Sequence, residues 1–307
     1  MKRSREFVLL GILVSLAFLS SSCTKTKNND LSENEQRSLK QYLLGHNIKV
    51  QPLASGLYYL PTDTGSGIKP QASDVVLFNF TLRLTSDEVV RTNIDSVAKM
   101  NGIYNAAYLY RPLEYRISWW YPGLREGFQL MREGEKATFI IPSSLAYGSA
   151  GYPAENIGSY YTLIVDVELI KVIHDPVAYE TAQIEKFVHD SIPATLNVTR
   201  NDSGVYHIID EAGSGDFPVN DKVVSIRYVL KLLDGTLVQK IAPSASAFSY
   251  TLGVDNVVPG FEQAVREMKK GESAWIIIPY KQGYGELPSH LPPFTTLVYY
   301  MNIVDIQ

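Results

Sequence analysis

The sequence is poor in the residues that build disulfide, metal and nucleic-acid sites. Cys23 is the only cysteine among 307 residues, so no disulfide can form within the chain. The five histidines show no ligand spacing, and no Ser/His/Asp or Cys/His pairing is evident, so we expect neither a metal site nor a cofactor. The formal net charge is −4 without any basic run, which disfavours nucleic acid as a partner. Twenty tyrosines against three tryptophans are typical of a soluble, β-rich chain with aromatic clefts.

The first 23 residues predict export. A basic start precedes an apolar stretch over residues 7–19, which is too short for a comfortable membrane span. Serines and then Cys23 follow, an order that resembles the signal of bacterial lipoproteins, in which the cysteine becomes a lipidated N-terminus. The resemblance implies a lipid anchor at Cys23, a tether over residues 24–32, and a place in the bacterial cell envelope on the periplasmic face of the outer membrane. A plain signal peptide or a buried cysteine is the alternative.

The remainder of the chain is a tandem duplication. Residues 122–148 recur at 259–285 with a constant offset of 137 positions (259 − 122), sharing Pro-Gly, Gly-Glu, Ile-Pro and Tyr-Gly pairs. Upstream, the Ser-Gly pairs that begin at Ser55 and Ser203 are offset by 148 positions (203 − 55). The first repeat therefore carries 11 extra residues (148 − 137), which we place in an insertion near residues 92–111.

Each repeat is far longer than a solenoid repeat, so two domains are expected, over residues 33–173 and 178–307. Apolar spacing predicts an N-terminal helix at the start of each, and a short helix after each Pro-Gly pair that ends at Gly134 or Gly271. Short apolar runs bounded by turn residues predict strands. These elements indicate an α+β fold, in which an antiparallel half-barrel sheet wraps around one short helix.

Between residues 234 and 293 the second repeat carries an ordered series of motifs. They are an Asp-Gly turn, Phe-x-Tyr-x-Leu-Gly, Val-Val-Pro-Gly-Phe, Met-x-x-Gly-Glu, Ile-Ile-Pro, Tyr-Gly and Leu-Pro-Pro. This order resembles the FKBP-type peptidyl-prolyl cis-trans isomerases, and the likeness extends from Val75 to Ile170 and from Val223 to Ile306. It implies two FKBP-like domains.

The resemblance also implies a dry apolar pocket that holds a proline ring while the X-Pro bond rotates, without a nucleophile or a metal. Phe261 would form its floor, and the backbone amide of Val258 and the hydroxyl of Tyr284 would be donors. In the second repeat the implied pocket comprises Tyr228, Val238, Phe248, Val257, Val258, Phe261, Tyr284, Leu291 and Tyr299. In the first repeat the corresponding residues are Phe80, Val90, Leu113, Trp120, Tyr121, Leu124, Tyr147, Ile157 and Val165.

Both repeats depart from the family pattern. Family members with good activity usually carry Phe-Asp after the Asp-Gly turn, whereas residues 238–239 are Val-Gln and residues 90–91 are Val-Arg. The first repeat also has Leu124 as its floor and Val165 in place of an aromatic wall, and its insertion falls at or beside the pocket mouth. We therefore expect the second repeat to be the better catalyst and the first to be weak or inactive.

Three functional hypotheses follow. The first is a lipid-anchored isomerase and chaperone that acts on proline-containing, unfolded or exported polypeptides. The second is a non-catalytic binding module for proline-containing or apolar segments. The third is a structural subunit of a cell-envelope complex, with Trp119-Trp120 and residues 100–110 as its interface. Without the resemblance, residues such as Val257, Phe261 and Tyr299 would be read as ordinary core.

Overall fold

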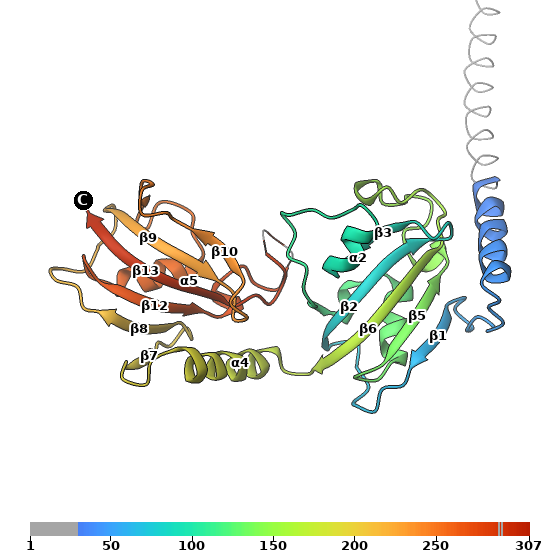
Figure 1. Ribbon diagram of the computed structural model, residues 1–307, viewed down its shortest axis with the longest axis horizontal. Coiled ribbons are helices and arrows are strands. Elements are labelled where there is room, and N and C mark those ends of the chain that lie inside the picture. The colour runs from blue at the N-terminus through green and yellow to red at the C-terminus, as the bar shows by residue number, and fades with distance from the viewer. Residues whose placement is uncertain (1–29, 288, 290) are drawn as a thin grey trace, which may run out of the picture. The chain divides into compact units, whose positions relative to one another are not determined.

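The computed structural model describes residues 30–287, 289 and 291–307. The chain divides into two compact units, Met1–Val172 and Ile173–Gln307, called domain 1 and domain 2 below (Figure 1). The predicted export signal and Cys23 lie outside the described residues, and residues 30–32, expected to end the tether, are helical. In the part of the chain that the structure describes, no helix is long and apolar enough to cross a bilayer.

Domain 1 is an antiparallel sheet that carries one short helix on its concave side. The strand order is β1-β5-β6-β2-β3, and β4 also pairs with β2. The strands are β1 (Tyr58–Asp63), β2 (Val75–Leu84), β3 (Val89–Thr92), β4 (Leu113–Arg116), β5 (Lys136–Ile141) and β6 (Leu163–Ile173). The helical elements are a helix over residues 30–45, α2 (Asp95–Met100), η1 (Ile117–Trp119), α3 (Pro122–Leu130), η2 (Ser143–Leu145) and η3 (Pro153–Glu155).

Domain 2 repeats this arrangement. Its strand order is β10-β9-β13-β12-β8-β7, and β11 also pairs with β9. The strands are β7 (Val198–Arg200), β8 (Tyr206–Glu211), β9 (Val223–Lys231), β10 (Leu237–Lys240), β11 (Phe248–Thr251), β12 (Ser273–Ile278) and β13 (Leu297–Ile306). Its helical elements are α4 (Pro176–Ser191), α5 (Pro259–Arg266) and η4 (Tyr280–Gln282). The predicted α+β fold, with two antiparallel sheets each around a short helix and each preceded by a helix, is confirmed.

The short helices begin as the Pro-Gly pairs predict, because proline is favoured in the first helical turn, where its missing N–H is not needed. They end earlier than predicted, at Leu130 and Arg266. Gly134 and Gly271 are not helix caps: with φ of +87° and +81° they form the turns that lead into β5 and β12. A left-handed backbone favours glycine in a turn as much as in a helix cap. The prediction of a left-handed glycine was therefore right, but its assignment to the helix end was wrong.

The second residue of each pair sets how closely the helix approaches the sheet. A Cβ atom at Gly123 would collide with Cγ2 of Ile141, and a Cβ atom at Gly260 would collide with Cγ2 of Ile278. Both helices therefore lie against the strand that follows them, at a distance that only glycine permits. This close approach brings the residue after each glycine, Leu124 or Phe261, under the sheet.

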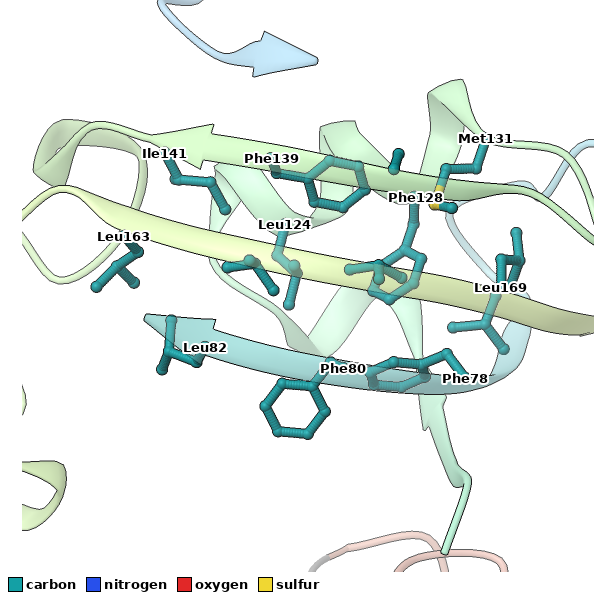
Figure 2. Packing of buried hydrophobic residues seen from close by; sticks show 14 of the residues in the cluster. Phe78, Phe80, Leu82, Leu124, Phe128, Met131, Phe139, Ile141, Leu163 and Leu169 are labelled. Atoms are coloured by element: carbon teal, nitrogen blue, oxygen red, sulfur yellow. The ribbon is translucent and has the colours of Figure 1, made fainter. Parts of the chain in front are cut away.

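Both faces of the central strands are covered. In domain 1, Phe139 and Ile141 of β5 belong to the buried cluster that Figure 2 shows, and the Phe139 ring meets Phe128 of α3 with centroids 6.2 Å apart. Ile140, between them, packs with Tyr42 of the N-terminal helix on the other face. Because successive side chains of a strand alternate between faces, a strand covered on both sides reads as an unbroken apolar run. In domain 2, Ile277 likewise packs with Ile184 of α4.

The insertion of domain 1 is an ordered excursion between β3 and β4. Its base is held by the buried side chain of Asn93: Oδ1 accepts a hydrogen bond from the Phe80 amide at 2.8 Å, and Nδ2 donates to the Arg111 carbonyl at 2.8 Å. Its outer part includes Met100, 84% exposed, and Tyr108, 65% exposed. Asn93 thus holds the two ends of the insertion together while its tip faces solvent.

Candidate functional site

In domain 2 the predicted floor residue, Phe261, lies inside an enclosure of aromatic rings. Three rings meet it edge-on: Tyr228 of β9 at 6.2 Å, Phe248 of β11 at 6.1 Å and Tyr299 of β13 at 5.4 Å between centroids. Their interplanar angles of 78°, 80° and 69° place positive ring edges on a negative ring face, the favoured geometry for aromatic pairs. Four elements thus build one apolar site around the start of α5.

Three tyrosines of this site, Tyr228, Tyr284 and Tyr299, are close enough to influence one another's ionisation. Burial raises the pKa of Tyr228, and the nearby Tyr284 raises it further. Burial likewise raises the pKa of Tyr299, with additional contributions from Tyr284 and Tyr228. Tyr228 and Tyr299 therefore keep their protons at neutral pH and can donate hydrogen bonds. The predicted donor Tyr284, in the loop between β12 and β13, lies near both of them.

The four aliphatic residues predicted for this site are not among the rings that contact Phe261. Val257 and Val258 are half-buried directly before α5, and the Val258 carbonyl accepts the Phe261 amide at 3.0 Å, which starts the helix. Leu291 is buried in the loop before β13, and Val238 is half-buried on β10. The structure therefore brings together Tyr228, Phe248, Phe261, Tyr284 and Tyr299, and leaves these four aliphatic residues on neighbouring segments.

Sequence reasoning missed Tyr250. Its ring centroid lies 5.7 Å from that of Phe261 and 5.9 Å from that of Phe248. The side chain is 3% exposed, and within the described residues its hydroxyl has no hydrogen-bond partner. Residues two apart on a strand share a face, so the Phe-x-Tyr motif itself carried the signal that Tyr250 joins Phe248 at the site.

The equivalent site of domain 1 is a small cavity. Its lining includes six of the nine residues that the sequence implied for this pocket, together with Phe78, Leu82, Arg91 and Glu155, which sequence reasoning did not select. The six are Phe80, Trp120, Tyr121, Leu124, Tyr147 and Val165. Leu113 and Ile157, buried in the surrounding core, and Val90, half-buried against it, do not line the cavity.

An ion pair and bulky rings narrow this cavity. Nη1 of Arg91 lies 2.5 Å from Oε1 of Glu155, and the Arg91 guanidinium lies 5.8 Å from the Phe80 ring centroid. The Trp120 ring contacts Phe78 edge-on, with centroids 6.2 Å apart, and within the described residues its indole N–H is buried without a partner. The remaining volume is about 30 Å³. An apolar cavity that takes up benzene measures about 150 Å³, so a prolyl ring does not fit here unless the lining moves.

Two phenols in the domain 1 site are held in their protonated form. Burial raises the pKa of Tyr121, and Tyr147 adds to that shift. Burial raises the pKa of Tyr147 to about 12, and the negative charge of Glu155 acts in the same direction, while Arg91 opposes it. The cavity is therefore lined by neutral groups, apart from the ion pair at its mouth.

Comparison with known proteins identifies the family of the sequence. The sequence pattern of the FKBP-type peptidyl-prolyl cis-trans isomerases matches residues 66–170 and 215–304. These segments make up more than half of the chain, which therefore belongs to this family. Within it, the chain carries the family's domain twice in tandem.

Relatives with assigned names are similar to part of the chain. A probable FKBP-type peptidyl-prolyl cis-trans isomerase FkpA from Neisseria meningitidis is 39% identical over 123 residues, 40% of this chain and 40% of its own. FkpA from Aeromonas hydrophila is 34% identical over 152 residues, 48% of this chain and 51% of its own. The crystal structure of FkpA from Escherichia coli has a TM-score of 0.40 at 28% identity, covering 56% of this chain and 74% of that one. The chain thus spans about half the length, or less, of these curated relatives.

Proposed function

We propose that the chain is a peptidyl-prolyl cis-trans isomerase and folding chaperone for exported proteins, and that domain 2 is its active domain. The observation that carries this proposal is the aromatic enclosure of Phe261. The barrier to rotation about an X-Pro bond, about 18–20 kcal/mol, comes from amide resonance. A twisted amide has lost that resonance and is less polar, so a dry apolar site favours it over the planar amide.

The residues of domain 2 suit this chemistry without any acid–base step. The faces and edges of Phe261, Phe248 and Tyr299 would enclose the proline ring. The hydroxyl of Tyr284 and the backbone amide of Val258 would donate to the carbonyl groups on either side of the rotating bond, which holds them while the bond turns. Gln239 stands where family members with good activity carry an acid, so we expect a modest rate.

Domain 1 would contribute binding rather than catalysis. Its cavity of about 30 Å³ does not admit a prolyl ring as it stands. Its floor is Leu124, and Arg91 occupies the position of the missing acid. We propose that domain 1 holds client polypeptides while domain 2 acts on their prolyl bonds.

We also propose that Cys23 is lipidated and anchors the chain on the periplasmic face of the outer membrane. The support is the order of basic residues, apolar stretch, serines and cysteine in residues 1–23. Two or more acyl chains suffice for stable membrane attachment, whereas one does not.

The activity is tested on the full chain by a refolding assay limited by prolyl isomerisation. Phe261→Leu places in domain 2 the floor residue that domain 1 already accommodates, so it should fold, and we expect at least a tenfold lower kcat/KM, about 1.4 kcal/mol. Tyr284→Phe should lower it as well, whereas its counterpart Tyr147→Phe in domain 1 should not. The proposal fails if the wild-type chain is no faster than Phe261→Leu, or if only Tyr147→Phe lowers the rate.

A second candidate is a binding module without catalytic activity. The absence of the pocket acid from both domains favours it. In that case the chain would bind unfolded, proline-containing polypeptides with an affinity that Phe261→Leu weakens, while the uncatalysed rate of isomerisation stays unchanged. The structural-subunit hypothesis instead predicts a stoichiometric envelope partner that is lost when residues 100–110 are deleted.

A further inference from the structure

One buried carboxylate fastens both ends of the loop that carries Tyr284. Glu180 projects from α4 and is 9% exposed. Its Oε1 accepts a hydrogen bond from the Tyr280 amide at 2.7 Å and another from the Thr296 hydroxyl at 2.5 Å. Tyr280 follows β12 after Pro279, and Thr296 directly precedes β13, so these two contacts hold the start and the end of the loop between the strands.

Domain 1 contains the same arrangement. Glu35, on the N-terminal helix, accepts from the Ser143 amide at 2.6 Å and from the Thr162 hydroxyl at 3.0 Å, both on Oε1, and from the Ser143 hydroxyl at 2.7 Å on Oε2. Ser143 follows β5 and Thr162 precedes β6. The loop held in this way carries Tyr147, which lines the domain 1 cavity.

The glutamate and its two hydrogen-bond donors are not separated by one constant offset between the two domains. The three positions differ by 145 (180 − 35), 137 (280 − 143) and 134 (296 − 162) residues, because insertions separate them. They nevertheless meet at one carboxylate in each domain.

The hydrogen bonds continue from the fastened end toward the pocket tyrosine. The Tyr280 carbonyl accepts the Gly285 amide at 2.8 Å, and the Gly285 carbonyl accepts the Phe294 amide at 3.1 Å. In domain 1 the Ser143 carbonyl accepts the Gly148 amide at 2.9 Å, and the Gly148 carbonyl accepts the Tyr160 amide at 2.8 Å. Gly285 and Gly148 each directly follow the tyrosine, so each chain of bonds ends beside it.

The hydrogen bonds of Glu180 do more than attach α4 to the sheet. The apolar face of α4 already attaches it, since Ile184 packs against Ile277 and Val298. Burial raises the pKa of Glu180, which shows that its charged form is costly to desolvate, although its hydrogen bonds offset part of that cost. A leucine would attach the helix without that cost, whereas only an acceptor can hold the two donors at the ends of the loop.

We propose that Glu180 is a positioning residue for the pocket of domain 2, and that α4 thereby belongs to the frame of the site. Glu35 is the equivalent in domain 1. The inference rests on the proposed function for its consequence on catalysis. A loop that is not held populates its binding-competent position only part of the time. The apparent dissociation constant then rises in inverse proportion to that fraction, while turnover of bound substrate changes less. Loss of Glu180 should therefore act mainly on KM.

Amide hydrogen exchange on the full chain tests the positioning role without requiring catalysis. Glu180→Ala should speed exchange at the Tyr280 and Gly285 amides by about ten- to a hundredfold, the loss expected for a hydrogen bond to a charged acceptor. Glu180→Gln keeps an oxygen acceptor and should restore most of the protection. Thr296→Val removes one of the two bonds and should give a smaller effect in the same loop. Glu35→Ala is the matched control and should speed exchange at Ser143 and Gly148 but leave Tyr280 and Gly285 unchanged.

The assay with a prolyl peptide then gives the functional readout. Glu180→Ala should raise KM about tenfold with at most a twofold change in kcat, and Glu180→Gln should lie near the wild type. The proposal is overturned if Tyr280 and Gly285 exchange in Glu180→Ala as they do in the wild type, or if exchange rises equally across β12 and β13, which would mean general destabilisation. If the wild-type chain catalyses nothing, the proposed function fails, and the exchange rates still decide whether Glu180 holds the loop.

Discussion

Arg91 and Glu155 form an ion pair at the mouth of the domain 1 cavity, with 2.5 Å between Nη1 and Oε1. They come from β3 and η3, which are 64 residues apart in the sequence. The family resemblance places an acid where Arg91 stands, so this site has a cation at that position, and Glu155 of the loop between β5 and β6 supplies its counter-charge. The same loop carries Tyr147, so the ion pair joins one wall of the cavity to another.

Breaking this pair should loosen the domain 1 loop with little loss of stability. In Glu155→Gln we expect faster amide exchange over residues 147–157 and a change in unfolding free energy within about 1 kcal/mol, because the pair is partly exposed to solvent. Asp95→Asn, which breaks the exposed pair with Lys99 in the insertion, is the control and should leave that exchange unchanged. Equal exchange in Glu155→Gln and the wild type would show that the pair does not hold the loop.

The raised pKa of Glu180 predicts a pH-dependent contribution to stability. Burial raises its pKa above the ordinary value of 4.5, so the folded state binds the proton more tightly than the unfolded state. The contribution is therefore fully present below 4.5 and is lost as the pH rises through the folded value. Urea unfolding of the wild type and Glu180→Gln at several pH values should show the wild type gaining stability relative to the variant as the pH falls. A difference that stays constant with pH would contradict it.

The close approach of α5 to β12 predicts that Gly260→Ala is destabilising. The added Cβ atom meets Cγ2 of Ile278, and overpacking of this kind costs about 1–3 kcal/mol. Gly45→Ala is the matched control: no atom lies within 4 Å of a Cβ there, so we expect a change within about 0.5 kcal/mol. Equal unfolding free energies for the two variants would mean that the helix can move away without cost.

Asn93 should matter more to domain 1 than any residue of the exposed insertion tip. Asn93→Ala removes the acceptor of the buried Phe80 amide and a donor to the Arg111 carbonyl, which costs about 1–3 kcal/mol. Asn105→Ala, in an exposed turn of the insertion, should change stability by no more than about 0.5 kcal/mol. The comparison is made by urea unfolding. A larger loss of unfolding free energy in Asn105→Ala than in Asn93→Ala would contradict the proposal that Asn93 holds the two ends of the insertion together.

The anchor is tested by cell fractionation. Cys23→Ala removes the only thiol that could be acylated, so the protein should move from the membrane fraction to the soluble fraction of the envelope. Retention in the membrane fraction, at wild-type abundance, would count against lipidation of Cys23.

The secondary structure shared by the two domains could be predicted from the sequence because the same motifs occur twice in the same order. The offset of 137 residues located both short helices and the strands that follow them. The helix ends were misjudged because glycine in a left-handed backbone serves turns and caps alike. Assigning Gly134 to the turn before β5, and not to the end of the helix, required tertiary information that a local motif does not contain.

The site was predictable only as far as its motifs extend. Phe261, Tyr228 and Tyr299 were found through the family resemblance, and the structure places their rings together. The contact between Arg91 and Glu155 was not foreseen, because nothing in either local sequence indicates a partner so distant along the chain. Glu180 was overlooked for the same reason: its role depends on where two strand ends meet, not on its neighbours in α4.

Gly123 and Gly260 have a consequence for how the two halves of the duplication could drift apart. Each collides with an isoleucine if it gains a methyl group, whether or not the pocket beside it is used. The adjacent residue is under no such restriction, and it is Leu124 in one copy and Phe261 in the other. In a more distant copy of this domain, the glycine would therefore indicate that the helix still packs closely on the sheet. The residue that follows it would indicate which side chain forms the pocket floor.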